Sequence, residues 1–220
     1  MPKPPCPHGQ GYTDVRLADK FSCALILLAA GASTRMGRPK QLLPIGARPL
    51  LRLVVEAALA APVSPIVVVL GANAAEIAPC LDGLPVQVVA NANWAEGMGT
   101  SLRCGMESLK ACAPTVDAVI VALADQPDFS SAHIAKLIET RRSTGRPIIA
   151  SECDGVRGPP VLFAAKFFPV LLALQGDAGA RTLLRERADE VTAVPVATAR
   201  DLDTPADYTD YLGQKPPSRD

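Results

Sequence analysis

The sequence predicts a three-layer α/β fold, in which a mostly parallel central sheet carries helices on both faces. Three observations support this fold class. Apolar runs of strand length alternate with segments of helical spacing along the chain. Several of these runs are continuously apolar, as in parallel strands that are buried on both faces. Hydrophobic residues make up 49% of the 220 positions, which is enough for a large core.

The first part of the chain alternates strands and helices in a regular order. The predicted strands are 23–30, 65–70, 85–89, 117–123 and 147–150, and the predicted helices are 49–60, a short one between 73 and 80, 97–111 and 130–142. Pro62 and Gly145 are expected to end the helices that they follow. Asn73 and Ser130 are expected to cap the helices that they precede.

The part from Ser151 onward is less regular. It predicts a Gly- and Pro-rich loop at 155–160, helices near 164–174 and 178–187, a short strand near 191–196 and a final turn at 204–211. Neither an internal repeat nor a linker is visible. We therefore expect one domain over residues 22–212, between flexible tails at 1–21 and 213–220.

The composition excludes several classes of protein. The 22 Lys and Arg residues balance 22 Asp and Glu residues, whereas nucleic acids or anionic membranes call for a basic surplus. No segment reaches the ~20 apolar residues of a membrane span, and the N-terminus does not resemble a signal peptide. The six cysteines form no C-x-x-C pair and only two histidines are present. We therefore expect reduced cysteines in a cytoplasmic protein rather than a zinc site or a disulfide framework.

The strand ends carry the candidate chemistry, because ligands of such sheets bind beyond the carboxyl ends of the strands. The first strand leads into Leu28-Ala-Ala-Gly-Ala-Ser-Thr-Arg-Met-Gly-Arg-Pro-Lys40. Its small residues leave backbone N–H groups free to hold phosphate oxygens, and Arg35 and Lys40 bring cations close to them. This pattern favours a polyphosphate over a plain solvated basic loop. It is neither a Walker A loop nor the G-x-G-x-x-G of dehydrogenases.

Two aspartates are candidate metal ligands. Asp125 follows the fourth predicted strand, where a carboxylate is costly unless a cation pairs with it. Mg²⁺ that bridges the phosphates to Asp125 would satisfy it, and Asp203 is the candidate second carboxylate. The alternatives are a turn at Asp125, which precedes Pro127, and helix capping by Asp203 or Asp207.

Three further stretches offer polar groups. Residues 91–101 combine Asn and Ser side chains with a glycine-rich approach to a helix N-terminus, which suits a ribose and base edges. Trp94 within it is expected to be a packing anchor. The stretches 155–160 and 176–181 each hold glycines and one Arg, so either can bind a second anionic substrate or form a plain turn.

Five motifs in order resemble the MobA-like nucleotidyltransferases, and within them the molybdenum-cofactor cytidylyltransferases. The resemblance covers residues 23–211. The motifs are Leu-Ala-Ala-Gly-x-Ser-x-Arg-Met-Gly-x-x-Lys at 28–40 with Gln41-Leu-Leu-Pro44, Asn-x-x-Trp-x-x-Gly-Met-x-x-Ser at 91–101, Asp125-Gln-Pro127, Gly176-Asp-x-Gly-Ala-Arg181 and Asp201-Leu-Asp-Thr-Pro205. The Leu-Ala-Ala-Gly form is similar to the cytidylyl branch, whereas guanylyl enzymes tend to show Leu-Ala-Gly-Gly. Pro159 departs from the family, which often has His or Asn there.

The resemblance implies a Rossmann-like fold and Mg²⁺-dependent transfer of a cytidylyl group from CTP to the phosphate of molybdopterin, with release of pyrophosphate. A recipient molybdoenzyme or its chaperone would be a further partner. The implied catalytic residues are Arg35, Lys40 and Asp125, and the implied metal ligands are Asp125 and Asp203. The implied nucleotide-binding residues are Leu28, Ala29, Ala30, Gly31, Ser33, Arg35, Lys40, Asn91, Ser101 and Asp125, and the acceptor-binding residues are Gly158, Pro160, Asp177 and Arg181.

Other functions remain open on the sequence alone. One alternative is a non-catalytic accessory protein that binds a nucleotide or the cofactor for molybdoenzyme maturation. Another is a sugar- or polyol-phosphate nucleotidyltransferase, because the first loop reads the triphosphate and not the acceptor. An oxidoreductase has the least support, since the dinucleotide fingerprint is absent.

Overall fold

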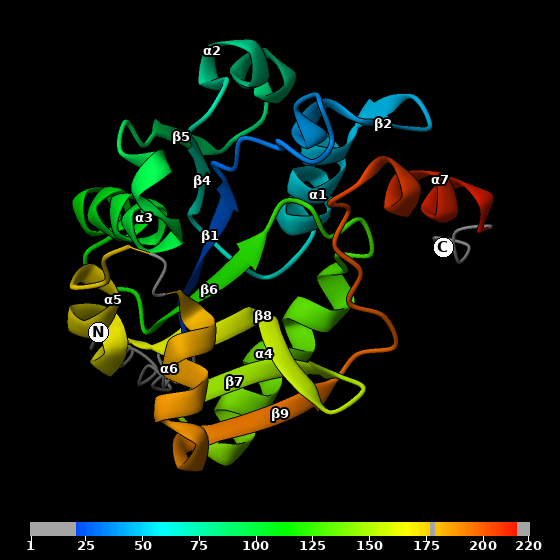
Figure 1. The fold of residues 1–220 in the computed structure, drawn as a ribbon. Helices are drawn as coiled ribbons and strands as arrows, with labels where there is room; N and C mark the ends of the chain where they lie inside the picture. The colour runs from blue at the N-terminus through cyan, green and yellow to red at the C-terminus, as the bar shows by residue number, and fades with distance from the viewer. Residues whose placement is uncertain (1–20, 177–178, 215–220) are drawn as a thin grey trace, which may run out of the picture.

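The computed structural model describes residues 21–176 and 179–214. The predicted tails, apart from the residues next to the domain, and the predicted acceptor residue Asp177 lie outside these ranges. The centre of the fold is a seven-stranded sheet with the order β5-β4-β1-β6-β8-β7-β9 (Figure 1). Its strands are β1 (Cys23–Ala29), β4 (Ile66–Leu70), β5 (Gln87–Ala90), β6 (Ala118–Leu123), β7 (Ile148–Cys153), β8 (Val156–Ala164) and β9 (Val191–Pro195).

Helices cover both faces of this sheet (Figure 1). One face packs against α1 (Leu50–Leu59), α2 (Ala74–Ile77), α4 (Ser131–Thr144) and α7 (Pro205–Gly213). The other face packs against α3 (Met98–Cys112), α5 (Phe168–Leu172) and α6 (Ala180–Glu186). A small hairpin of β2 (Pro44–Ile45) and β3 (Arg48–Pro49) precedes α1.

Alternate side chains of the central strands supply two separate cores. On β1, Leu25 and Leu27 pack into one core, and Ile26 and Leu28 pack into the other. Because both faces are covered, the strand reads as a continuous apolar run rather than an alternating one. The predicted three-layer α/β fold with a mostly parallel sheet is confirmed.

The structure corrects the prediction around residue 155. The stretch 155–160 is not a loop, because β8 begins at Val156 and runs antiparallel to both β6 and β7. Gly158 and Pro160 therefore lie on a strand in the interior of the sheet, between β6 and β7. Prolines discourage a strand assignment, since each removes an N–H from the ladder, and this stretch contains two of them.

Several predicted details at helix ends and domain edges also change. The side chains of Asn73 and Ser130 make no capping hydrogen bond at the helices that they precede. Phe21, assigned to the N-terminal tail, packs against the core. At the other end, α7 includes Gly213.

The topology brings two predicted site segments together. Strands β1 and β6 are parallel neighbours, with Leu28 opposite Leu123. The N–H of Ala124 donates to the carbonyl of Leu28 at 3.1 Å, so the chain leaves both strands at the same edge. Among the described residues, no helix is both long enough and apolar enough to cross a bilayer.

Candidate active site

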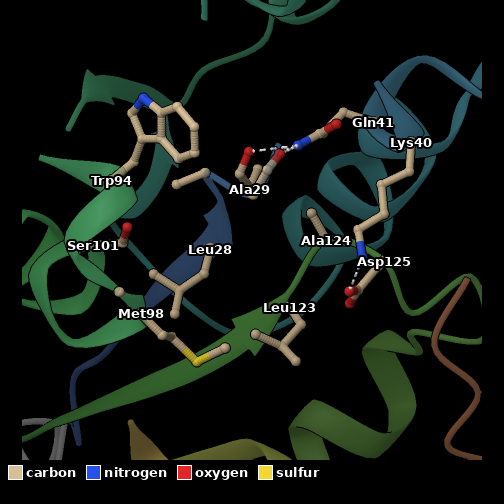
Figure 2. Close-up of a pocket in the computed structure, with 13 residues that line it drawn as sticks. Leu28, Ala29, Lys40, Gln41, Trp94, Met98, Ser101, Leu123, Ala124 and Asp125 are labelled. Atoms are coloured by element: carbon tan, nitrogen blue, oxygen red, sulfur yellow. Dashed lines mark hydrogen bonds and ion pairs between the residues drawn. The ribbon is translucent and has the colours of Figure 1, made fainter. Parts of the chain in front are cut away.

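A cavity of about 300 Å³ lies beyond the carboxyl ends of β1 and β6. Seven of the predicted site residues line it: Leu28, Ala29, Ala30, Gly31, Lys40, Ser101 and Asp125. Figure 2 shows Lys40, Gln41 and Asp125 on one side, with Trp94, Ser101 and Met98 on the other and Leu28 and Leu123 between them. The cavity thus has a charged end and a largely apolar end.

The charged end is a network of two cations and two carboxylates. The Nζ atom of Lys40 lies 2.6 Å from Oδ2 of Asp125 and 2.8 Å from Oδ1 of Asp203. Nη2 of Arg35 lies 2.8 Å from the other oxygen of Asp203. The structure therefore brings together four predicted residues that are up to 168 positions apart in the chain.

Burial divides this network into an inner and an outer part. The side chains of Lys40 and Asp125 are only 15% and 16% exposed, whereas that of Arg35 is 69% exposed. Desolvation raises the pKa of Asp125 despite the neighbouring Lys40. Burial by itself would lower the pKa of Lys40, but the charges of Asp125 and Asp203 outweigh it and raise the pKa. The hydrogen bond from Lys40 lowers the pKa of Asp203.

The segment before α7 explains why Asp203 lies beside Asp125. The N–H of Leu202 donates to the carbonyl of Asp125 at 3.0 Å. The amide of Gln126 donates to Asp201, and Arg200 donates to Asp128. The 200–203 stretch is thus fastened along 125–128, which places the Asp203 carboxylate at Lys40.

The first loop presents free backbone donors next to this network. Among the described parts of the chain, the N–H groups of Gly31, Ala32 and Ser33 meet no hydrogen-bond acceptor. A Cβ built on Gly31 would meet no atom of the described residues within 4 Å. Groups that are left free in this way are suited to phosphate oxygens that approach the backbone closely.

Gln41 shapes the same loop; it stands in the first motif, but the sequence assigned it no role. It is 2% exposed, and its Nε2 donates to the carbonyls of Ala29 at 2.8 Å and Gly31 at 3.0 Å. Ser33 accepts a hydrogen bond from the N–H of Lys40. Its place in the first motif, directly after the candidate lysine, is the signal that could have identified it.

Trp94 and the start of α3 form the apolar end. A Cβ on Gly71, which follows β4, would lie 2.6 Å from both Cβ of Trp94 and the carbonyl oxygen of Ala30. Gly71 therefore lets these two walls approach each other, a requirement that the sequence patterns did not reveal. Asn91 lies outside the cavity lining, and its amide donates to the hydroxyls of Thr100 and Ser101. It holds Ser101 in place.

A second cavity of about 260 Å³ lies on the β8 side of the charged network. Its lining includes Gly158 and Arg181, both predicted as acceptor-binding residues, together with Gln126, Arg157 and Asp201. Pro160 lines a neighbouring pocket of about 30 Å³ instead. Because Gln126 adjoins Asp125, this second cavity lies next to the charged network.

The donor set at Asp125 suits a divalent cation. Oδ1 of Asp125 is buried and meets no hydrogen-bond donor among the described residues. An orphaned, buried carboxylate oxygen calls for a hydrogen-bond donor or a cation, and a second carboxylate lies across Lys40. The described residues hold no group of three or more His, Cys, Asp or Glu side chains of the kind that forms an all-protein cage. Two carboxylates plus substrate phosphates are the usual Mg²⁺ arrangement.

A model of the MobA-like NTP transferase domain matches residues 25–191. Two characterised relatives are similar over most of their length. Nicotine blue oxidoreductase of Paenarthrobacter nicotinovorans is 36% identical, over 81% of this chain and 91% of its own. Purine catabolism protein PucB of Bacillus subtilis is 29% identical, over 83% of this chain and 92% of its own.

Solved structures show the same architecture. Rv0371c of Mycobacterium tuberculosis in complex with manganese is 28% identical, with a TM-score of 0.71 over 88% of this chain and 100% of that one. A nucleotidyl transferase of Methanothermobacter thermautotrophicus is 25% identical, with a TM-score of 0.72 over 86% of this chain and 95% of its own. The fold is thus one that nucleotidyltransferases use.

Proposed function

Because the chain belongs to the MobA-like NTP transferase family, we propose that it transfers the cytidylyl group of CTP to the terminal phosphate of molybdopterin. The family and the fold make it a nucleotidyltransferase. The observation that supports the proposed site best is the pair Asp125 and Asp203 around Lys40, beside free backbone donors. We propose that it acts in the cytoplasm, on CTP and the molybdenum cofactor.

The polarity of the first cavity orients the nucleotide. The triphosphate would lie on the free N–H groups after Gly31, within reach of Lys40 and Arg35, and the nucleoside would lie toward Trp94 and Ser101. In this arrangement the cations face the oxygens on which charge develops as pyrophosphate leaves. Preorganised charges of this kind contribute more in a water-poor site than in bulk solvent.

Asp125 and Asp203 would hold Mg²⁺, with Asp125 offering its orphaned oxygen. The ion, when bound, neutralises phosphate charge and orients the α-phosphate. The acceptor phosphate is already ionised at neutral pH and needs no protein base. One of its oxygens attacks the α-phosphorus, the bond from this phosphorus to the bridging oxygen breaks, and pyrophosphate leaves. The protein supplies position and charge rather than a covalent intermediate.

We place the acceptor in the second cavity, where Arg157 and Arg181 would meet its anionic groups. From there a phosphate would reach the network from the side opposite the nucleotide. The arginine side chains keep polar partners that an incoming anion can replace: Arg157 pairs with Glu152 at 3.2 Å, and Arg181 lies 4.0 Å from Asp201. The recipient of the product would be a molybdoenzyme or its chaperone.

The test is release of pyrophosphate from CTP in the presence of Mg²⁺ and molybdenum cofactor, with GTP and ATP as comparisons. Asp125→Ala should lower turnover by roughly two orders of magnitude or more while the protein stays folded. The control is Asp117→Ala, which removes the carboxylate at the opposite end of β6 and should keep turnover near normal. Near-normal turnover of Asp125→Ala with Mg²⁺ would show that the metal assignment is wrong.

A second candidate function is favoured by one specific observation, the name of the 36% identical relative, which is an oxidoreductase. A phosphate-binding loop can hold the pyrophosphate of a dinucleotide as well as a triphosphate. Consumption of NADH or NADPH, followed by absorbance in the same assay, separates the two reactions. An accessory protein would bind CTP without releasing pyrophosphate. A sugar- or polyol-phosphate nucleotidyltransferase would release pyrophosphate with one of a panel of such acceptors.

A further inference from the structure

We propose that Gln41 is a positioning residue, which holds the first loop in the shape that binds the triphosphate. The inference rests on the proposed function, because it concerns how the phosphates are held. Gln41 sits in a short 3-10 helix, Lys40–Leu42, directly after the lysine of the charged network. It is one of the few buried polar side chains in the described residues, with 2% of its surface exposed.

The two hydrogens of its amide reach across the end of β1. Nε2 of Gln41 donates them to the carbonyl oxygens of Ala29, 2.8 Å away, and of Gly31, 3.0 Å away (Figure 2). The carbonyl between them, that of Ala30, accepts from the N–H of Ala72 at 3.0 Å. Three successive carbonyls are therefore held by the protein itself.

Holding the carbonyls fixes where the N–H groups point. In a trans peptide the C=O and the following N–H lie on opposite sides, so a carbonyl turned toward Gln41 sends the next N–H away from it. The carbonyl of Gly31, held by Gln41, thus directs the N–H of Ala32, and the carbonyl of Ala30, held by Ala72, directs the N–H of Gly31. Neither of these N–H groups, nor that of Ser33, has an acceptor among the described residues. If these peptides rotated, a carbonyl would face the phosphates and repel them.

Gln41 also joins the loop to the charged network. The hydroxyl of Ser33 accepts from the N–H of Lys40 at 3.0 Å and donates to Oε1 of Gln41 at 3.4 Å. The backbone of Lys40 and the loop that carries the free donors are thus tied through one set of hydrogen bonds. Among the described residues, the side chain of Gln41 bonds to Ala29, Gly31 and Ser33 and not to Asp125 or Asp203, so its effect is on geometry and not on the metal pair.

The experiment measures CTP affinity and steady-state kinetics for Gln41→Leu and Gln41→Asn. Leucine removes both donors, and asparagine keeps the amide but is one methylene too short to span both carbonyls. We expect Gln41→Leu to weaken binding of Mg·CTP and of inorganic tripolyphosphate by roughly tenfold or more, with a raised KM and a smaller change in kcat. Gln41→Asn should fall between wild type and Gln41→Leu.

Trp94 provides the binding signal, because it is the single tryptophan of the chain and lines the same cavity. The matched control is Ser22→Ala, which removes a hydroxyl that donates to Asp117 at the opposite end of β1. The Gln41 variants and Ser22→Ala should all lower Tm, but only the Gln41 variants should lose phosphate affinity. Amide hydrogen exchange across residues 29–36 should increase in Gln41→Leu and not in Ser22→Ala.

The outcomes separate this inference from the proposed function. If wild type binds CTP and Gln41→Leu binds it equally well, the positioning role is overturned and the proposed function stands. If Gln41→Leu fails to fold, equal affinity of Gln41→Asn and wild type overturns the role instead. If wild type binds neither CTP nor tripolyphosphate, both the proposed function and this inference are wrong.

Discussion

Asp125 combines burial with a charge that the proposed function needs. Desolvation raises its pKa, and one of its oxygens has no hydrogen-bond donor among the described residues. The folded chain therefore binds a proton at this carboxyl more tightly than the unfolded chain does. The stability that the group contributes is present below its unfolded pKa, near 4, and is lost as the pH rises through the raised folded value. At neutral pH the ionised carboxylate lowers the stability of the metal-free protein.

We therefore predict that Asp125→Asn raises Tm at neutral pH in the presence of EDTA, although it abolishes nucleotidyl transfer. A gain of 1 kcal/mol corresponds to roughly 2 to 4 °C in a chain of this size. Thermal melts from pH 7 down to about pH 4 should show the gain shrinking, because the wild-type carboxyl takes up its proton in that range. A lower Tm of Asp125→Asn at neutral pH would contradict this account.

Asp117→Asn is the control of opposite sign. The hydrogen bonds from Ser22 lower the pKa of Asp117, so its contribution to stability is present above the unfolded pKa and is lost as the pH falls through the folded value. At neutral pH this variant should lose Tm rather than gain it. The two aspartates lie at opposite ends of β6, so the two variants compare the same substitution next to the same strand.

Single residues also show what the sequence was able to predict. Lys40 and Asp125 were predictable because each follows a segment that ends at the carboxyl edge of the sheet, where ligands bind. Asp203 was proposed as a metal ligand only because Asp125 needs a partner, and its contact with Lys40 was not predicted. The role of Gln41 and the need for Gly71 were missed, because hydrogen bonds to carbonyls and the approach of two backbones leave no periodic pattern in a sequence.

The position of Asp203 depends on the element that follows it. At the start of α7, the hydroxyl of Thr204 accepts from the N–H of Asp207, and the carboxylate of Asp207 accepts from the N–H groups of Thr204 and Asp203. The sequence allowed either Asp203 or Asp207 to cap this helix. In the structure Asp207 takes part in the capping box, which leaves the carboxylate of Asp203 free for Lys40 and Arg35.

Thr204→Ala should therefore affect both the helix and the site. Loss of the cap costs about 1 kcal/mol, or roughly 2 to 4 °C in Tm. It should also raise the Mg²⁺ concentration needed for half-maximal activity, because the backbone next to Asp203 is less firmly held. Thr209→Ala removes a hydroxyl from the same helix that bonds only to the carbonyl of Pro205, and should change neither quantity appreciably. If the two variants need the same Mg²⁺ concentration, the helix cap does not contribute to the position of Asp203.

At the same scale, β8 shows where pattern reading fails. Its first half carries Gly158 and two prolines, and its second half is a buried apolar run that ends at Ala164. The register between β7 and β8 shifts between Ala150 and Ser151, and this irregularity accommodates the prolines without a regular ladder. A strand that is interrupted in this way has neither the alternation nor the continuous run on which strand prediction depends.

The whole molecule is built from two unlike halves. Strands β5, β4, β1 and β6 are all parallel, and the carboxyl ends of β1 and β6 line the first cavity. Beyond β6, the antiparallel β8 introduces the part of the sheet that borders the second cavity. The parallel half was predictable from continuous apolar runs. The other half was predictable only in part. Strands were expected near 147–150 and 191–196, whereas β8 and the strand order were not, because they depend on long-range pairing that local sequence does not encode.

This division predicts that the two substrates can be uncoupled by mutation. Arg157→Ala and Arg181→Ala act on the second cavity, so both should leave the rise of Tm with Mg·CTP unchanged, since that rise reports binding in the first cavity. Each should raise the KM for the acceptor by roughly tenfold, the cost of one charge-assisted contact. Arg142→Ala, on the exposed side of α4, is the matched control and should change neither value. A loss of the CTP-dependent shift in Arg157→Ala or Arg181→Ala would mean that the two cavities work as one site. An unchanged acceptor KM in both would move the acceptor elsewhere on the protein.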